Sequence, residues 1–244
     1  MIIKKDSLFA TQISHVSAQQ ARDIDLACIK KAWVPTDQLM TIAAWHLARL
    51  SNEYIKRPSR IAVLAGKGHN GADALLAAMY LSNWGHQVSI FLMADIQEYK
   101  GLSFRQLSQV KVAPGCRVLS RQDFDLDSVD LVIDGLLGVG LKLAARPPIV
   151  PIINQLNHAN VPVISVDIPS GLDASDGPIH SPIVKATMTV TFVLPKIGFL
   201  KDASKSYLGD VFLVDIGVPP HVLRQFNCDQ RPPFHQNSVF KIEY

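Results

Sequence analysis

The sequence has few cysteines, no CxxC pair and no long apolar run. Cys28, Cys116 and Cys228 are odd in number and far apart, which disfavours a disulfide framework or a zinc site and favours a reducing, intracellular compartment. The N-terminus lacks the apolar core of a secretory signal, and no stretch approaches the roughly 18 apolar residues of a membrane span. We therefore expect a cytoplasmic protein without a membrane partner.

Charge is also scarce. Charged residues make up 18% of the chain, and the formal net charge is +3. The positive residues are scattered, with Lys30-Lys31 as the densest run, so nucleic acid is not an expected partner. Apolar residues make up 48% of the sequence, which is enough for a sizeable core and excludes global disorder.

The length of 244 residues fits one large α/β domain or two small ones. Neither an internal repeat nor a low-complexity linker divides the chain. We therefore expect a single domain over residues 1–244, with a core of about 16–219 and a tail over 220–244. Pro232-Pro233 is expected to begin a loose end.

Helix signals come first, and strands and helices alternate afterwards. Ser17 followed by Gln20 is a capping-box pattern ahead of a first helix, and Pro35 separates it from a second helix over about 37–52. The patterns that follow predict strands over 61–65, 87–93, 117–119, 130–134, 161–167, 187–194 and 210–216, and helices over 71–84, 103–110 and 151–157. This alternation predicts a doubly wound, three-layer α/β/α sandwich with a mostly parallel, Rossmann-like sheet.

A glycine loop follows the first predicted strand of this series and opens a helix. Residues 66–71 read GKGHNG, which has the letters of GxGxxG. Glycines let the backbone approach a phosphate, and the free N–H groups of a helix start favour an anion. The acidic residue of an NAD fingerprint would fall near Asp95, which does not sit cleanly at a strand end. Nucleotide contact and a structural turn both remain open, whereas the missing Walker pattern disfavours ATP hydrolysis.

Two later strands end on an aspartate followed by a glycine loop. Asp134 precedes GLLGVG, and Asp167 precedes IPSG. Because burying an unpaired carboxylate is costly, each should meet a cation, a donor or a ligand, although Asp134 could instead cap the next turn. The oxygens of Asn70, Asp134 and Ser170 could coordinate a hard cation. His69 is as easily a local hydrogen-bonding residue as a catalyst.

Four motifs together resemble one known family. They are VDIPSGLDASDG (166–177), DGLLGVGLK (134–142), TVTFVLPKIGFL (189–200) and GDVFLVDIGVP (209–219). Their order and spacing over about 16–219 resemble the NAD(P)H-hydrate epimerase family, also called the YjeF N-terminal domain. Within the family's G-x-G-N-N-G-G-D-G loop, this chain departs at His69, Ala72 and Ala74.

The resemblance implies an isomerase of nicotinamide-cofactor repair. It would interconvert the R and S epimers of NAD(P)HX, in which water has added across a double bond of the nicotinamide ring. A partner dehydratase would consume the S form, and a homodimer through the N-terminal helices is plausible. The resemblance also implies potassium ligands at Asn70, Asp134 and Ser170, and dinucleotide contacts at His69, Asn70, Gly71, Ala72, Asp73, Gly138, Val139, Gly140, Leu141, Lys142, Leu143, Ala144 and Asp167.

Epimerisation requires the hydroxyl beside the ring nitrogen to leave and return on the other face, which needs an acid and a base. We assign Asp167 as the acid/base and electrostatic group, and Lys196 as a second catalytic candidate that donates a proton or contacts a phosphate. A solvated loop lysine is the alternative for Lys196. Two other functions stay open: a catalytically silent binding or scaffold module of this fold, and a generic dehydrogenase, which the missing acidic residue disfavours.

Overall fold

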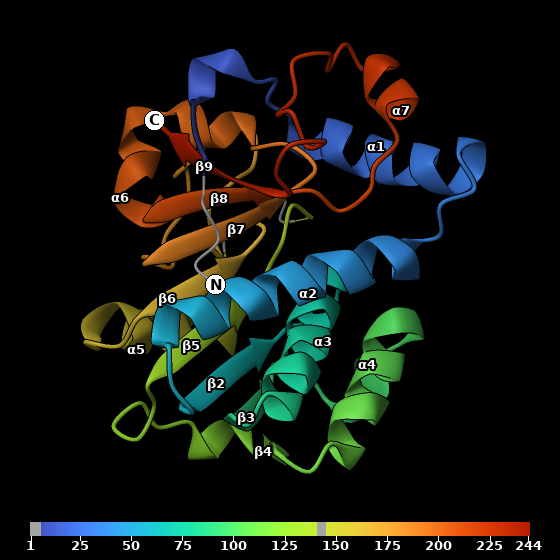
Figure 1. Cartoon of the computed structure of the whole chain (residues 1–244). Helices are drawn as coiled ribbons and strands as arrows, with labels where there is room; N and C mark the ends of the chain where they lie inside the picture. The colour runs from blue at the N-terminus through green and yellow to red at the C-terminus, as the bar shows by residue number, and fades with distance from the viewer. Residues whose placement is uncertain (1–5, 141–144) are drawn as a thin grey trace.

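The computed structural model describes residues 6–140 and 145–244 (Figure 1). Its centre is a 9-stranded sheet in the order β1-β9-β8-β7-β6-β5-β2-β3-β4. All neighbouring strands pair parallel except β8 and β9, which pair antiparallel. The strands are β1 (Asp6–Phe9), β2 (Arg60–Ala65), β3 (Gln87–Leu92), β4 (Cys116–Leu119), β5 (Leu131–Gly135), β6 (Val163–Val166), β7 (Met188–Phe192), β8 (Asp210–Val214) and β9 (Val239–Glu243).

The helices are α1 (Ala18–Lys31), α2 (Thr36–Ile55), α3 (His69–Asn83), α4 (Gly101–Val112), α5 (Ile149–His158), α6 (Lys205–Leu208) and α7 (Pro220–Arg224). The first five helices fall close to their predicted positions, and the two short ones, α6 and α7, were not predicted. The predicted capping box is confirmed: the Gln20 N–H donates to Ser17 Oγ at 3.2 Å, and the Ser17 N–H donates to Gln20 Oε1 at 3.0 Å. In the described ranges 6–140 and 145–244, no helix has the length and apolar character needed to cross a membrane.

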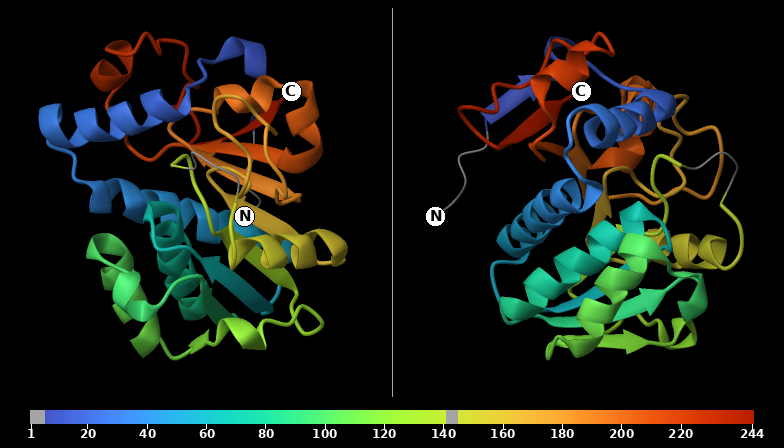
Figure 2. Two further views of the ribbon diagram at one scale, coloured as in Figure 1. Left: turned by 180° about the vertical axis from the view of Figure 1, so that it is seen from behind. Right: turned by 90° about the vertical axis from the view of Figure 1, so that its right-hand side faces the viewer.

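Side chains that alternate along β2 build two separate cores on the two faces of the sheet. Ile61 and Val63 belong to the cluster that packs against α2 and α3. Ala62 and Leu64 belong to the cluster that includes Ile153 of α5. Views from behind and from the side show these helices on either side of the strands (Figure 2). The predicted three-layer α/β/α sandwich with a mostly parallel sheet is therefore confirmed.

The prediction of a loose end after Pro232-Pro233 is wrong. Instead, β9 lies within the sheet between β1 and β8, and its Val239, Phe240 and Ile242 are buried. Burying these apolar side chains and satisfying their backbone hydrogen bonds holds the segment in place. The helix α6, between β7 and β8, also had no sequence signal.

The turn from β2 into α3 brings backbone into direct contact with backbone. A Cβ on Gly71 would lie 1.8 Å from the carbonyl oxygen of Gly66, and a Cβ on Gly66 would lie 2.1 Å from that of Leu136. Neither contact can be relieved by a side-chain rotation. These glycines therefore allow the loop to pack closely against the end of β5.

We predict that Gly71→Ala lowers the free energy of unfolding by about 2 kcal/mol or more, because the methyl group overlaps the Gly66 peptide. Gly140→Ala is the matched control, since a Cβ there meets nothing within 4 Å, and it should change stability by less than about 1 kcal/mol. Urea unfolding followed by circular dichroism measures both. Equal stability of the two variants would contradict the close-packing interpretation.

Candidate active site

A cavity of about 910 Å³ runs along the carboxyl-end edge of the sheet. Its floor is formed by the segments that follow β2, β3, β5, β6 and β7, and its other walls by α1 and α2. This is the edge where parallel α/β sheets bind ligands, and the volume is within the usual range of small-molecule sites. Charged side chains that line it are Arg22, Asp25, Lys67, Asp73, Glu98, Arg146, Asp167 and Lys196.

The structure brings most of the predicted dinucleotide contacts to this cavity. Those on its wall are His69, Asn70, Gly71, Asp73, Gly138, Val139, Gly140 and Asp167. Ala72 instead lies in the main core, as does Ala74. The methyl groups at these two departures from the family loop therefore pack inside the protein and not against a ligand. Leu141, Lys142, Leu143 and Ala144 lie outside the described residues.

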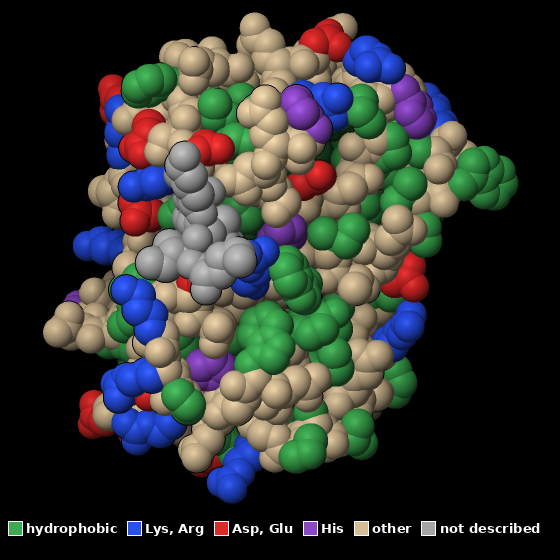
Figure 3. Space-filling model, in the orientation of Figure 1, with side chains coloured by type: hydrophobic (Ala, Val, Ile, Leu, Met, Phe, Trp, Pro, Cys, Tyr) green, Lys and Arg blue, Asp and Glu red, His purple; other side chains and the backbone are tan. Residues whose placement is uncertain are grey.

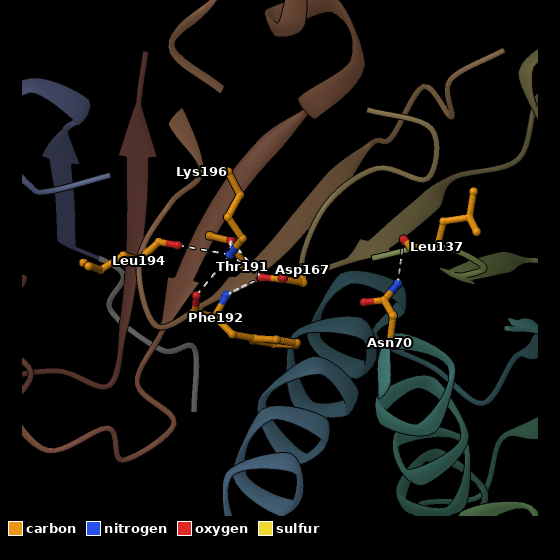
Figure 4. Close-up of polar contacts among 7 residues, drawn as sticks. All are labelled: Asn70, Leu137, Asp167, Thr191, Phe192, Leu194 and Lys196. Carbon is orange, nitrogen blue, oxygen red and sulfur yellow. Dashed lines mark hydrogen bonds and ion pairs between the residues drawn. The ribbon is translucent and has the colours of Figure 1, made fainter. Parts of the chain in front are cut away.

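Asp167 follows β6 directly and is held by three donors. Its Oδ1 accepts from Lys196 Nζ at 2.6 Å, from the Phe192 N–H at 3.0 Å and from Thr191 Oγ1 at 3.2 Å (Figure 4). Its side chain is still 15% exposed on the cavity wall. With Oδ1 occupied, Oδ2 is the oxygen that is free to meet a ligand. This arrangement suits a fixed negative charge beside a reacting cation.

Lys196 is the partner of Asp167 and is almost completely enclosed, with 2% of its side chain exposed. Besides Asp167, its ammonium group contacts Thr191 Oγ1 at 3.1 Å, the Leu194 carbonyl at 3.1 Å and the Phe192 carbonyl at 3.3 Å. An ammonium group has three hydrogens, so these acceptors use all of its donor capacity. The alternative of a solvated loop lysine is therefore wrong.

Two residues on the cavity wall have strained backbones. Asp167 has φ +61° and Val193 has φ +65°. Aspartate tolerates the left-handed region, whereas a β-branched residue there is an outlier. Such strain costs on the order of 1–3 kcal/mol per residue and collects at functional sites. Here it occurs on both sides of the Lys196 contacts.

The three predicted potassium ligands converge around one peptide. Asn70 Nδ2 donates to the Leu137 carbonyl at 3.0 Å, and Ser170 Oγ accepts from the Leu137 N–H at 2.9 Å. Ser170 Oγ also donates to Asp134 Oδ1 at 2.6 Å. One carboxylate among neutral oxygens fits a hard cation of low charge. By contrast, the described residues contain no cluster of three His, Cys, Asp or Glu side chains that could hold a metal.

Asp134 itself lies behind the cavity and is fully buried. Its oxygens accept from Ser165 Oγ at 2.8 Å, from the Ser170 N–H at 3.0 Å and from the Leu136 N–H at 3.3 Å. Burial raises the pKa of Asp134, and these hydrogen bonds oppose the rise. The Leu136 contact is the one that a turn cap requires, so a structural role is present alongside any role toward a cation.

Sequence reasoning missed Asp25. It is on α1, far from every strand-end motif, yet it lines the cavity. A signal was available: Ala21, Ile24, Asp25 and Cys28 share one helix face, and an acidic residue in an otherwise apolar stripe is unusual. Arg22, on the same helix, donates from NH1 to the Val139 carbonyl at 3.1 Å and so ties α1 to the loop after β5.

The comparisons with known proteins agree with this geometry. Residues 36–198 match the family described as "YjeF-related protein N-terminus". The chain is 31% identical over 220 residues to the NAD(P)H-hydrate epimerase of Rhodopirellula baltica, covering 88% of this chain and 89% of that protein. It is also 31% identical to the bifunctional NAD(P)H-hydrate repair enzyme Nnr of Moorella thermoacetica, of which it spans 43%.

A solved structure has the same fold. The crystal structure of yeast ynu0, YNL200c, superposes with a TM-score of 0.80 at 21% sequence identity. The match covers 94% of this chain and 100% of the yeast chain. At that identity the likeness concerns the architecture, including the sheet whose edge forms the cavity.

We predict that Lys196→Met lowers the free energy of unfolding by about 3 kcal/mol, because it leaves the Asp167 carboxylate without its buried counter-charge. The double variant Lys196→Met/Asp167→Asn should lose less than the single one. Lys201→Met, at an exposed lysine of the same segment, is the control and should stay within about 0.5 kcal/mol. Urea unfolding of the three variants measures these differences. A double variant that is less stable than Lys196→Met would refute the assigned pairing.

Proposed function

We propose that this chain, which belongs to the family described as YjeF-related protein N-terminus, is an epimerase that interconverts the R and S forms of hydrated NAD(P)H. Relatives named NAD(P)H-hydrate epimerase are similar over most of the chain. The observation that supports the proposal at the atomic level is the position of Asp167, whose carboxylate is bonded to Lys196 and lines the cavity. The activity is that of an isomerase in nicotinamide-cofactor repair.

The chemistry calls for a negative charge at this place. When the hydroxyl leaves, the lone pair of the ring nitrogen forms a cationic iminium. A carboxylate that is already oriented stabilises that cation without rearranging. Asp167 is such a group, since three donors fix its Oδ1. Lys196, whose donors are all engaged inside the protein, is then a positioning residue and not a phosphate contact.

The rest of the cavity offers contacts for the dinucleotide. The first residues of α3, His69 to Gly71, and the loop Gly138 to Gly140 lie on its wall, and the free N–H groups at the start of α3 favour a phosphate group. His69 differs from the family's asparagine but is exposed and still offers one ring N–H donor. We assign the predicted contacts among Leu141 to Ala144 to the same loop on the resemblance alone.

Potassium is the cation that we propose at Asn70, Asp134 and Ser170. The ion would hold the loop after β5 against the start of α3 and the segment after β6. Its binding would require the Ser170 hydroxyl to turn its proton from Asp134 Oδ1 to the Leu137 carbonyl, which lies 3.2 Å from Ser170 Oγ. Each of the two oxygens would then have a lone pair for the ion. The ion would supply positive charge next to the loop after β5, which the residues named here position.

We further propose a dehydratase that removes the S epimer as the functional partner, and a homodimer through the N-terminal helices. The relative called a bifunctional NAD(P)H-hydrate repair enzyme supports a second repair activity acting with this one. For the dimer, α1 exposes Leu26 and Ile29, and the connection from α1 to α2 exposes Trp33, with 88% of its surface accessible. Further hydrophobic side chains gather on the same face near α2 (Figure 3).

We predict that the protein accelerates the loss of R-NADHX when a dehydratase specific for the S form is present in excess. Asp167→Asn should reduce this rate by about 100-fold or more, because it removes the charge that meets the cation. Asparagine tolerates the left-handed backbone, so the fold should survive. Chromatography of the two epimers measures the rate, and ligand binding without any acceleration by the wild type would favour a silent binding module.

We also predict that potassium stabilises the protein. Replacing choline by potassium at constant ionic strength should raise the melting temperature by about 3 °C or more. Asp134→Asn should abolish this increment, whereas Ser165→Ala, which loses a hydrogen bond to Asp134 but no proposed ligand, should keep it. An equal increment in all three proteins would contradict the cation site.

A further inference from the structure

Two carboxyl groups besides Asp167 line the same end of the cavity. Asp25 comes from α1 and Asp73 from the second turn of α3. Among the described residues, no side chain or backbone group donates a hydrogen bond to either carboxyl. Asp73 is only 9% exposed, and an unpartnered carboxyl is rare at such a place because its desolvation is not repaid. Its position on a ligand cavity indicates that the missing partner is a ligand, whereas Asp25 is an accessible carboxyl on the same cavity.

Asp25 is brought to the cavity by a contact between distant parts of the chain. The Val16 N–H donates to the Pro195 carbonyl and the Ile197 N–H donates to the Val16 carbonyl, both at 2.9 Å. This bridge flanks Lys196 and sets the start of α1 beside it. Asp25 lies on the same helix face as the buried Ile24 and Cys28 and lines the cavity.

Asp73 is placed from a different wall. The flanking Ala72 and Ala74 are buried in α3, and the Asp73 residue is only 9% exposed. It therefore reaches the cavity from α3, whereas Asp25 reaches it from α1. A nicotinamide ring bound beside Asp167 would therefore have Asp25 on one wall of the cavity and Asp73 on another.

The surrounding protein and the neighbouring charges raise the pKa of both carboxyls. Desolvation, and next the negative charge of Asp167, raise the pKa of Asp25 to about 6. The same two causes, with Asp25 as a third, raise the pKa of Asp73 well above its ordinary value. Of the other ionisable groups on the cavity wall, Lys196 is paired to Asp167, and the remaining ones are Arg22, Lys67, His69, Glu98 and Arg146. Both carboxyls therefore bind a proton more readily than a free aspartate does.

We propose, resting on the function inferred above, that Asp73 and Asp25 are the acid and base of epimerisation, one for each face of the ring. The Asp73 carboxyl protonates the departing hydroxyl, the C–O bond breaks, and water leaves the cationic ring. Water then adds to the opposite face, a new C–O bond forms, and its surplus proton passes to Asp25. Asp73 ends ionised and Asp25 protonated, which is the state that catalyses the reverse direction.

The mechanism makes oxygen exchange and change of configuration two separate events, which a single acid/base group would not separate. Cleavage and re-formation on one face exchange the hydroxyl oxygen with water and leave the configuration unchanged. Cleavage on one face followed by addition on the other changes the configuration. A variant with one carboxyl removed should therefore retain oxygen exchange into one epimer while it loses interconversion.

The test compares Asp25→Asn, Asp73→Asn and the control Asp23→Asn, a substitution on the same helix at a residue that does not line the cavity. Purified R- and S-NADHX are incubated separately in water labelled with oxygen-18, without dehydratase. Mass spectrometry reports exchange and chromatography reports interconversion. We expect each cavity variant to lose interconversion by about 100-fold or more, and each to retain exchange in a different epimer. The control should match the wild type.

Loss of exchange in both epimers in each cavity variant would overturn the proposal, as would interconversion within threefold of the wild type. Neither result would affect the proposed function, which depends on the wild type alone. Wild-type protein without interconversion above the uncatalysed rate would refute that function and this inference with it. Urea unfolding confirms that the variants are folded, which is expected because asparagine adds no charge.

Discussion

The ion pair between Lys196 and Asp167 connects the elements that surround the cavity. Lys196 contacts Asp167 after β6 and the carbonyls of Phe192 and Leu194 after β7. The backbone on either side of it pairs with Val16 and so fixes where α1 begins. An ammonium group without water must satisfy all its donors within the protein. The strained backbones at Asp167 and Val193 lie beside these contacts.

Because of this ion pair, the site contains two kinds of carboxylate. Asp167 accepts hydrogen bonds from three donors, whereas Asp25 and Asp73 accept none from the described residues and have a pKa that the charge of Asp167 raises. Transfer of a proton between Asp25 and Asp73 leaves Asp167 unaltered. The site thus combines a permanent electrostatic element with exchangeable protons, which is the division that chemistry through a short-lived cation requires.

The sequence allowed the strand ends to be predicted, because apolar runs that stop at an aspartate and a glycine loop identify one edge of a parallel sheet. Asp134 and Asp167 lie where this reasoning expects them. Asp25 interrupts the apolar face of its helix, but the sequence could not place that face on the cavity. Its place depends on the pairing of Val16 with the residues around Lys196, which no local pattern encodes. Ala72 could not be separated from Asp73 by sequence, since only the direction of each side chain on α3 sends one to the core and the other to the cavity.

The sheet edge formed by β1, β9 and β8 has a consequence for synthesis. The strand Asp6–Phe9 pairs with Val239–Glu243, so it must wait until residue 243 has left the ribosome. At typical rates of translation, that delay is on the order of ten to fifty seconds. During that time the edge of β1 is open to other nascent chains, and the edge of β8 is open from its own synthesis until β9 follows. We therefore expect chaperones to be needed by this half of the domain and not by the half around β2 and β3.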